Sequence, residues 1–180
     1  MRFLVRFFGV VAMTGVDATE TMVKLGKHRC IDEDLDDKIR FVLADVCNSG
    51  LSTGSADFIW GEDAWCYVEN KPKMIAEAAR IVRSGGTIAF TDWIEGPNKM
   101  TDAEAQRFLA FMKFPNFADM DDYRKMLTGN QCEIVISENT ERYAPCVSLY
   151  IDMVSKQLTY DALKILGFNQ TVFEGLADEM

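Results

Sequence analysis

Two aspartates stand where a carboxylate can meet a nucleoside. Asp17 directly follows the apolar run at residues 9–16, and Asp45 lies just beyond the run at 39–43. A carboxylate at the end of a buried strand can accept hydrogen bonds from both ribose hydroxyls, as it does in dinucleotide-binding sheets. By itself Asp17 therefore indicates a nucleoside ligand and no particular reaction. An aspartate that only opens a helix is the alternative interpretation.

Two later apolar runs, residues 58–60 and 87–90, are followed by a second group of polar and aromatic side chains. These are Glu62, Asp63, Trp65, Tyr67 and Trp93. Aromatic rings that form a wall attract a methylated ammonium group through cation–π contact. A tyrosine hydroxyl is a poor base at its normal pKa but a good hydrogen-bond donor that can orient an acceptor. Packing of the same rings in the core is the competing interpretation.

The elements that must position these residues alternate between strands and helices. The apolar runs are nearly continuous, which fits strands of a parallel sheet covered on both faces. A helix is expected over residues 71–83, ended by the sequence Ser84-Gly85-Gly86, and another over 19–29, capped by Thr19. The repeated βαβ order predicts an α/β protein with a Rossmann-like, doubly wound and mostly parallel sheet. Ligands of such sheets bind at the carboxyl ends of the strands.

The second half of the chain changes character. Thr101 and Glu104 predict a capping box that opens an amphipathic helix. We expect a core domain over residues 1–100 and a helical lid over 101–180, with one returning core strand near 132–136. The lid would contain two further helices, at residues 121–127 and about 145–158. Tyr143 and Tyr150 are candidate contacts of the lid with the acceptor.

Composition limits the kinds of partner. The 180 residues carry a formal net charge of −9, so a broad electrostatic contact with nucleic acid is not expected. The apolar start is too short to span a bilayer. The 5 cysteines are odd in number and lack metal-site spacing, and His28 is the only histidine. We therefore expect no metal site, reduced thiols in a cytoplasmic protein, and a small molecule as ligand.

A longer stretch carries a family resemblance. Residues 58–95 read FIWGEDAWCYVENKPKMIAEAARIVRSGGTIAFTDWIE. They resemble the fourth strand, fourth helix and fifth strand of class I S-adenosylmethionine (SAM) dependent methyltransferases, above all the sarcosine/dimethylglycine and phosphoethanolamine N-methyltransferases. GVDATETMV at 15–23 and FVLADV at 41–46 resemble the second and third strands of the same family. The resemblance covers most of residues 1–138 and is more specific for the family than for a substrate.

The resemblance implies SAM as the cofactor and a role for each candidate residue. Asp45 would contact the adenine amino group, with the Val46 amide beside it. The transferred methyl group would lie beyond the fourth strand, which assigns Asp63 and Tyr67 to catalysis. The residues implied for the cofactor are Asp17, Ala18, Asp45, Val46 and Glu62, and those for the acceptor are Trp65 and Trp93.

The chain departs from the family pattern in three ways. The family's G-x-G-x-G loop would lie before Met1, because residues 2–10 resemble the helix that follows it, and no seventh strand is evident before Met180. In the family's strand order, 3-2-1-4-5-7-6, both missing strands are internal and would leave unpaired backbone beside each gap. We therefore expect a fragment that binds SAM weakly or not at all. Tyr67 stands where phosphoethanolamine methyltransferases have a histidine, which argues against a phosphobase substrate.

The function expected from this resemblance is methyl transfer to a small amine such as sarcosine or dimethylglycine. C- or O-methylation of a lipid or natural product is the first alternative, because the lid sequence does not select between them. A non-catalytic methyltransferase-like subunit is the second. An NAD oxidoreductase fits Asp17 but not the stretch at residues 62–65.

Overall fold

The computed structural model describes residues 1–96 and 98–142, and beyond these only residues 145, 148–149, 152–153, 155–157, 159 and 161. Contacts divide the chain into two units, Met1–Ile136 and Ser137–Met180. The division lies beyond residue 100, where the core domain was expected to end. Tyr143 and Tyr150 lie outside the described residues, as does part of the helix expected at 145–158.

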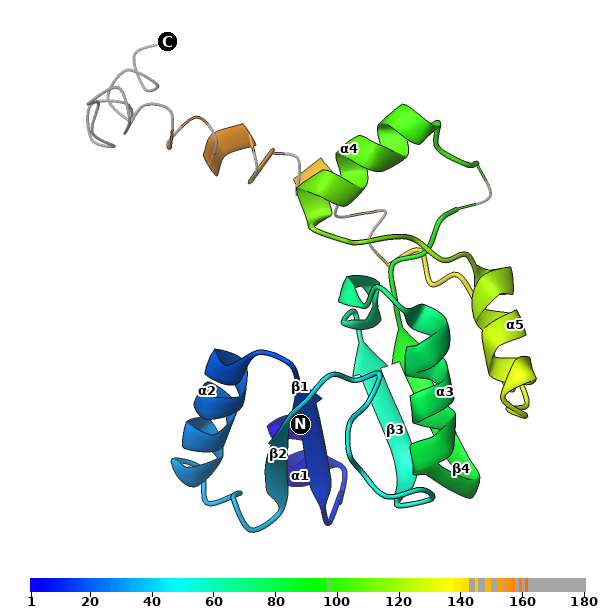
Figure 1. The fold of residues 1–180 in the computed structure, drawn as a ribbon. Helices are drawn as coiled ribbons and strands as arrows, with labels where there is room; N and C mark the ends of the chain where they lie inside the picture. The colour runs from blue at the N-terminus through cyan, green and yellow to red at the C-terminus, as the bar shows by residue number, and fades with distance from the viewer. Residues whose placement is uncertain are drawn as a thin grey trace. The chain divides into compact units, whose positions relative to one another are not determined.

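The first half of the first unit is a parallel strand pair with its connecting helix (Figure 1). β1 (Met13–Asp17) pairs with β2 (Ile39–Leu43), and α2 (Glu20–Ile31) joins them. The sequence-based strand at 39–43 is confirmed, and α1 (Arg2–Phe7) is helical as the resemblance implied. A small core lies beneath this pair and is formed by Val5, Cys30, Leu35 and Ile39.

The second half repeats the same order. β3 (Ala56–Glu62) pairs in parallel with β4 (Val82–Thr91), and the connection contains the short helix η1 (Trp65–Tyr67) and α3 (Lys71–Ile81). Figure 1 shows α3 alongside these two strands. The larger core consists of Cys47, Trp65, Met74, Ile75, Ala78, Ala118 and Tyr123.

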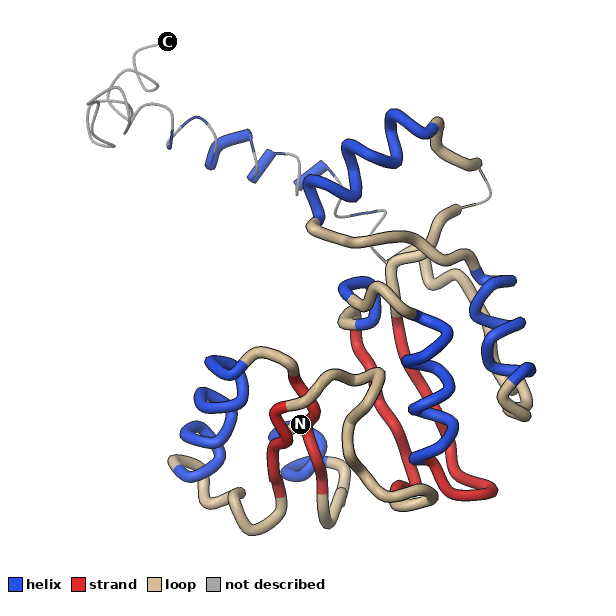
Figure 2. The backbone as a smooth tube through the Cα atoms, viewed as in Figure 1, coloured by secondary structure: helices blue, strands red, loops and turns tan. Residues whose placement is uncertain are grey.

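The strands therefore fall into two parallel pairs, β1–β2 and β3–β4 (Figure 2). Within the described residues no ladder joins β1 to β3. This arrangement matches the expected order, in which the second strand pairs with the third and the fourth with the fifth, on either side of a first strand. The α/β class and the parallel pairing predicted from the sequence are confirmed.

The end of α3 differs from the expectation. The helix ends at Ile81, and residues 84–86 belong to β4 instead of forming a helix stop. Gly85 has a φ of 73°, and the register of the two strands shifts between Ala56 and Phe58. Some bulges place one residue at positive φ, which glycine adopts without strain, and Gly85 occupies such a position here. The glycines therefore serve the bulge of the strand.

Two capping boxes begin the later helices. Thr101 and Glu104 form the predicted box at α4 (Asp102–Met112), and Asp119 and Asp122 form another at α5 (Met120–Gly129). Each box satisfies two backbone amides that have no partner inside the helix.

The stretch at 132–136 has no strand pairing, although a returning core strand was expected there. Val135 is 86% exposed and Ile136 is 77% exposed. An apolar stretch adopts strand structure only when a neighbouring strand satisfies its backbone groups, and no described strand lies beside this one. Separately, no helix in the described part of the chain combines the length and the apolar character needed to cross a membrane.

Candidate cofactor and acceptor site

Asp17 and Asp45 lie at the same edge of the first strand pair. Asp17 is in register with Leu43, so the parallel strands end together. Each carboxylate accepts a hydrogen bond from a backbone amide two residues later: Asp17 Oδ1 from Thr19 N at 2.8 Å, and Asp45 Oδ1 from Cys47 N at 2.8 Å. Aspartate favours such turns because its short carboxylate reaches its own backbone. The turns occupy Oδ1 of each carboxylate, which leaves Oδ2 for a ligand.

The helix-entry interpretation of Asp17 also holds. Thr19 is the N-cap residue of α2, but its side chain makes no capping hydrogen bond, contrary to the sequence-based expectation. The Asp17 carboxylate instead accepts a hydrogen bond from the Thr19 amide. Ala18 is exposed between the two, and Val46 is half-buried after Asp45. One carboxylate can therefore open the helix and still present an oxygen to a nucleoside.

Asp63, which directly follows β3, is fixed by hydrogen bonds to the end of β4. It follows Glu62, the exposed last residue of β3, and its backbone has a φ of 46°. The Asp63 amide donates to Thr91 O at 2.9 Å, and Thr91 Oγ1 donates to Asp63 Oδ1 at 3.0 Å. A positive φ at a residue other than glycine is strained and is concentrated at functional sites. The strain here is held by hydrogen bonds to β4.

The structure brings together two of the three candidate aromatic rings. The Tyr67 ring meets Phe114 edge-on at 5.1 Å between centroids, and Trp93 lies 6.3 Å from the same Phe114 ring. Trp65 is separate: it is 7% exposed and stacks on Phe90 at 4.2 Å. Its packing matches the core interpretation, whereas Tyr67 is 59% exposed and can meet a ligand.

Tyr67 also lines an open cavity of about 520 Å³. The far wall comes from the end of α4 and the turn that follows it, including Lys113 with a φ of 62°. The Glu69 backbone is attached to the segment after this turn, because Asn116 Nδ2 donates to Glu69 O at 2.8 Å. The lining residues are Tyr67, Glu69, Leu109, Ala110, Lys113, Phe114 and Pro115. An acidic and a basic side chain thus share a cavity that is otherwise largely apolar.

The chain is similar to known proteins over this same region. A family model described as a methyltransferase domain matches residues 2–90. The 27-O-demethylrifamycin SV methyltransferase of Amycolatopsis mediterranei is 26% identical over 135 residues, which cover 74% of this chain and 50% of that protein. The dimethylglycine N-methyltransferase of Parasynechococcus marenigrum is 31% identical over 72 residues, 39% of this chain and 26% of that protein.

A solved structure agrees with these relatives. A crystal structure from Galdieria sulphuraria, assigned as a sarcosine dimethylglycine methyltransferase, superposes with a TM-score of 0.66 at 26% identity and covers 72% of this chain and 48% of that one. Residues 2–90 thus match the methyltransferase-domain family, and the chain as a whole is similar to SAM-dependent methyltransferases. It spans about half the length of the curated relatives that it matches.

The methyltransferase family uses SAM, and the residues of this chain fit such a cofactor. Two carboxylates end adjacent parallel strands, each with an oxygen left over by its turn. Hydroxyl and amino groups of a nucleoside are donors, and carboxylate oxygens are strong acceptors for them. The arrangement therefore suits the nucleoside part of SAM.

A buried polar cluster that includes Asp92, next to Trp93 in the chain, was not found from the sequence. Tyr123 donates a hydrogen bond to Asp92 Oδ2, while Asp92 Oδ1 is buried and has no hydrogen-bond partner among the described residues. Lys71, 3% exposed, donates to Asn116 Oδ1 at 2.7 Å. Asp92 immediately precedes Trp93, so a polar residue at the strand end was a usable signal. Tyr123 gave no such signal, because on an amphipathic helix it resembles an ordinary core residue.

Burial dominates the titration of this cluster. It raises the pKa of the Asp92 carboxyl and lowers the pKa of the Lys71 ammonium, since both charged forms lose water. It also raises the pKa of the Cys66 thiol to about 12. The Tyr123 pKa is raised by burial and by its hydrogen bond to Asp92. Cys66 and Tyr123 therefore stay protonated at neutral pH, and neither acts as a base.

Proposed function

We propose that this protein transfers a methyl group from SAM to a small amine that also carries a carboxylate, such as sarcosine or dimethylglycine. The observation that carries the proposal is that Glu69 and Lys113 both line the cavity to which Tyr67 contributes. An ammonium group would lie toward Glu69 and the Tyr67 ring, and a carboxylate toward Lys113. The similarity to dimethylglycine and sarcosine methyltransferases supports the same acceptor class.

In this proposal the cofactor is held by the ends of β1 and β2. Asp17 accepts hydrogen bonds from the ribose hydroxyls, with the Ala18 amide beside it. Asp45 accepts a hydrogen bond from the adenine amino group, with the Val46 amide beside it. Glu62 contributes from the end of β3. When bound, SAM supplies a methyl group on a positively charged sulfur. An unprotonated amine would bond to the methyl carbon in line with the carbon–sulfur bond, and the sulfur would leave as the neutral thioether.

The chain's own task is alignment and exclusion of water. The Tyr67 hydroxyl orients the amine, and Asp63, fixed by Thr91, lies at the strand end where it can take up a proton released by the acceptor. Trp93 contributes to the aromatic side of the acceptor region, together with Phe114. Trp65 supports this region from the core, since little of its surface is exposed. The reduced thiols expected from the sequence make a cytoplasmic location part of the same proposal.

A second candidate is methylation of a larger apolar acceptor at carbon or oxygen. The observation in its favour is the group of rings behind the cavity: Phe108 lies 6.4 Å from Trp93 and 5.4 Å from Phe117 between centroids. The similarity to a rifamycin O-methyltransferase points the same way. The two candidates differ in whether the acceptor must carry a charge.

The experiment is a panel of acceptors with radiolabelled SAM. Dimethylglycine and sarcosine are compared with dimethylaminoethanol, which lacks the carboxylate, and with an isoprenoid alcohol. Lys113→Gln should lower kcat/KM for dimethylglycine about tenfold or more and leave that for dimethylaminoethanol nearly unchanged, because only one acceptor loses a charge-assisted hydrogen bond. Lys24→Gln, on α2, is the matched control. Methylation of the isoprenoid alcohol alone would replace the amine by the second candidate.

A further inference from the structure

The loop between β2 and β3, residues 44–55, contains no helix or strand, yet its middle is buried. Ser49 is 4% exposed. Backbone groups buried outside regular structure need partners from elsewhere. In this loop the partners come from two side chains of α3.

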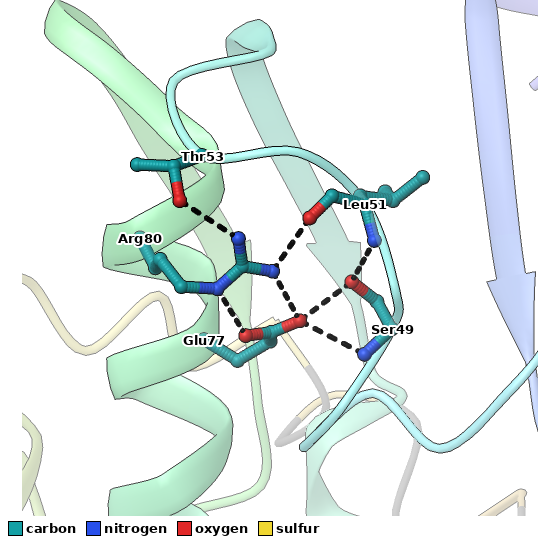
Figure 3. A network of polar contacts seen from close by, with 5 residues as sticks. All are labelled: Ser49, Leu51, Thr53, Glu77 and Arg80. Atoms are coloured by element: carbon teal, nitrogen blue, oxygen red, sulfur yellow. Dashed lines mark hydrogen bonds and ion pairs between the residues drawn. The ribbon is translucent and has the colours of Figure 1, made fainter.

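Glu77 and Arg80 bind the loop from one face of α3 (Figure 3). Glu77 Oε1 accepts from Ser49 N at 2.8 Å and from Ser49 Oγ at 2.6 Å. Arg80 Nη2 donates to Leu51 O at 2.7 Å, and its Nη1 donates to Thr53 Oγ1 at 3.0 Å. The two α3 side chains also join each other, with Arg80 Nε 2.7 Å from Glu77 Oε2. The result is a closed network that spans residues 49–53 of the loop.

The charges make this network strong. Glu77 is 9% exposed, and the Arg80 guanidinium beside it, with the Ser49 hydrogen bonds, lowers the pKa of the Glu77 carboxyl to about 2. Hydrogen bonds to an ionised carboxylate are shorter and stronger than those between neutral groups. The loop is therefore attached to α3 by ionised contacts at any pH near neutrality.

The attached segment adjoins the residues proposed to meet the adenine. Asp45 lies four residues before Ser49 and shapes its own turn through the Cys47 amide. Cys47 is buried, and its Sγ donates to Asn70 O at 3.5 Å, just ahead of α3. Val46 packs against the same core cluster as Cys47. The chain that follows Asp45 is thus attached at two points, by Cys47 to the residue before α3 and by Ser49 to α3 itself.

We propose that Glu77 and Arg80 are positioning residues for cofactor binding. They touch no ligand; they hold the loop in the conformation in which Asp45 and Val46 present their oxygen and amide to the adenine. This inference rests on the proposed roles of Asp45 and Val46 but not on the identity of the acceptor. A loop released from α3 must be ordered again when the cofactor binds, and that cost weakens the affinity.

The test uses Glu77→Gln, which keeps the size of the side chain but removes the charge. The dissociation constant for S-adenosylhomocysteine, measured by calorimetry, should rise about three- to tenfold, the range expected for one lost net hydrogen bond. Hydrogen exchange of the segment 47–54 should accelerate at the same time. The KM for the acceptor should stay within about twofold, because the acceptor cavity is built from other residues.

The matched control is Asp57→Asn. Asp57 also pairs with an arginine, Arg83 at 2.5 Å, but it is exposed on β3. Its exchange pattern in 47–54 and its cofactor affinity should equal those of the wild type. Ser49→Ala is the second variant: it removes only the hydroxyl between Glu77 Oε1 and the Leu51 amide, so it tests the loop even if Glu77→Gln folds poorly.

The results separate this inference from the proposed function. Faster exchange in 47–54 with unchanged S-adenosylhomocysteine affinity, in either variant, would overturn the positioning role. An equal loss of affinity for cofactor and acceptor would indicate general destabilisation of the protein. That outcome would also overturn the positioning role. If the wild-type protein binds S-adenosylhomocysteine but methylates no amine, the acceptor proposal fails while the positioning role is still judged by the affinities.

Discussion

At the scale of single residues, Asp17 and Asp45 do two things with one side chain. Each makes a turn with the amide two residues later, and each keeps an oxygen that the turn does not use. The turn restricts the carboxylate before any ligand arrives, so little rotamer entropy is lost on binding. This arrangement explains why an aspartate, and not a longer glutamate, suits both positions.

Asp17→Ala tests the cofactor role. We expect the dissociation constant for SAM to rise about tenfold to a hundredfold, since bonds to a charged acceptor are lost, while kcat at saturating SAM changes by less than about threefold. Calorimetry and steady-state kinetics measure the two quantities. A kcat that falls more steeply than the affinity would move Asp17 from binding to chemistry.

Tyr67→Phe should show the reverse pattern. Loss of the hydroxyl removes the orientation of the amine but not the ring against Phe114, so kcat should fall about three- to tenfold with SAM affinity unchanged. The same two measurements apply. Unchanged kcat together with weaker SAM binding would show that the roles of Tyr67 and Asp17 had been exchanged.

At the scale of elements, β3 depends on a glycine that the sequence did not single out. A Cβ on Gly61 would overlap the indole Nε1 of Trp65. Gly61→Ala should therefore lower the free energy of unfolding by about 1–3 kcal/mol, because the Trp65–Phe90 stack must shift. Gly96→Ala, which meets no atom within 4 Å, is the control. Urea unfolding measures both, and equal midpoints would contradict the tight approach.

The attachment of the loop to α3 also predicts a pH dependence. The Glu77 carboxyl has a folded pKa of about 2 against an ordinary value of 4.5. A lowered folded pKa stabilises the protein above the unfolded value, and this stability is lost as the pH falls from 4.5 toward 2. Over that window the wild type should lose about 2 to 3 kcal/mol more than Glu77→Gln. Parallel stability curves of the two proteins from pH 5 to 2 would contradict this linkage.

At the scale of the whole molecule, the strands form two parallel pairs with no ladder between β1 and β3 among the described residues. The candidate cofactor residues sit at the carboxyl ends of both pairs: Asp17 and Asp45 on one, Glu62 on the other. A ligand that contacts both pairs would stabilise the folded state as a whole, by mass action.

A thermal shift distinguishes an enzyme from a non-catalytic relative. SAM at about a hundred times its dissociation constant adds about 2.7 kcal/mol to the stability of the protein that binds it. For a chain of this size the Tm should rise by about 5 to 10 °C. Differential scanning calorimetry with and without SAM measures the shift, with ATP as a nucleoside control. No shift at millimolar SAM, even in a protein that includes the family's glycine-rich loop, would favour the non-catalytic subunit.

Much of this molecule is determined locally, and the sequence alone predicts that part. The strand at 39–43, the helix that begins near residue 71 and the capping box of Thr101 and Glu104 rest on periodicity and on hydrogen bonds between near neighbours. The carboxylates at strand ends follow from the same pattern. Gly85 and Gly86 misled the prediction, because a helix stop and a strand bulge can both use a glycine.

Only the tertiary structure decided which side chains meet. Trp65 and Tyr67 are two residues apart, yet Trp65 stacks on Phe90 in the core and Tyr67 faces Phe114 at the cavity. Glu69 lines the same cavity as residues 109–115, which lie some forty positions later in the chain. Glu77 accepts a hydrogen bond from Ser49, 28 positions earlier. The sequence by itself therefore determined the family, the order of the elements and the strand ends that carry carboxylates. The composition of the cavity beside Tyr67 and the attachment of the loop after Asp45 came from the fold, because contacts between distant residues depend on packing that no local pattern records.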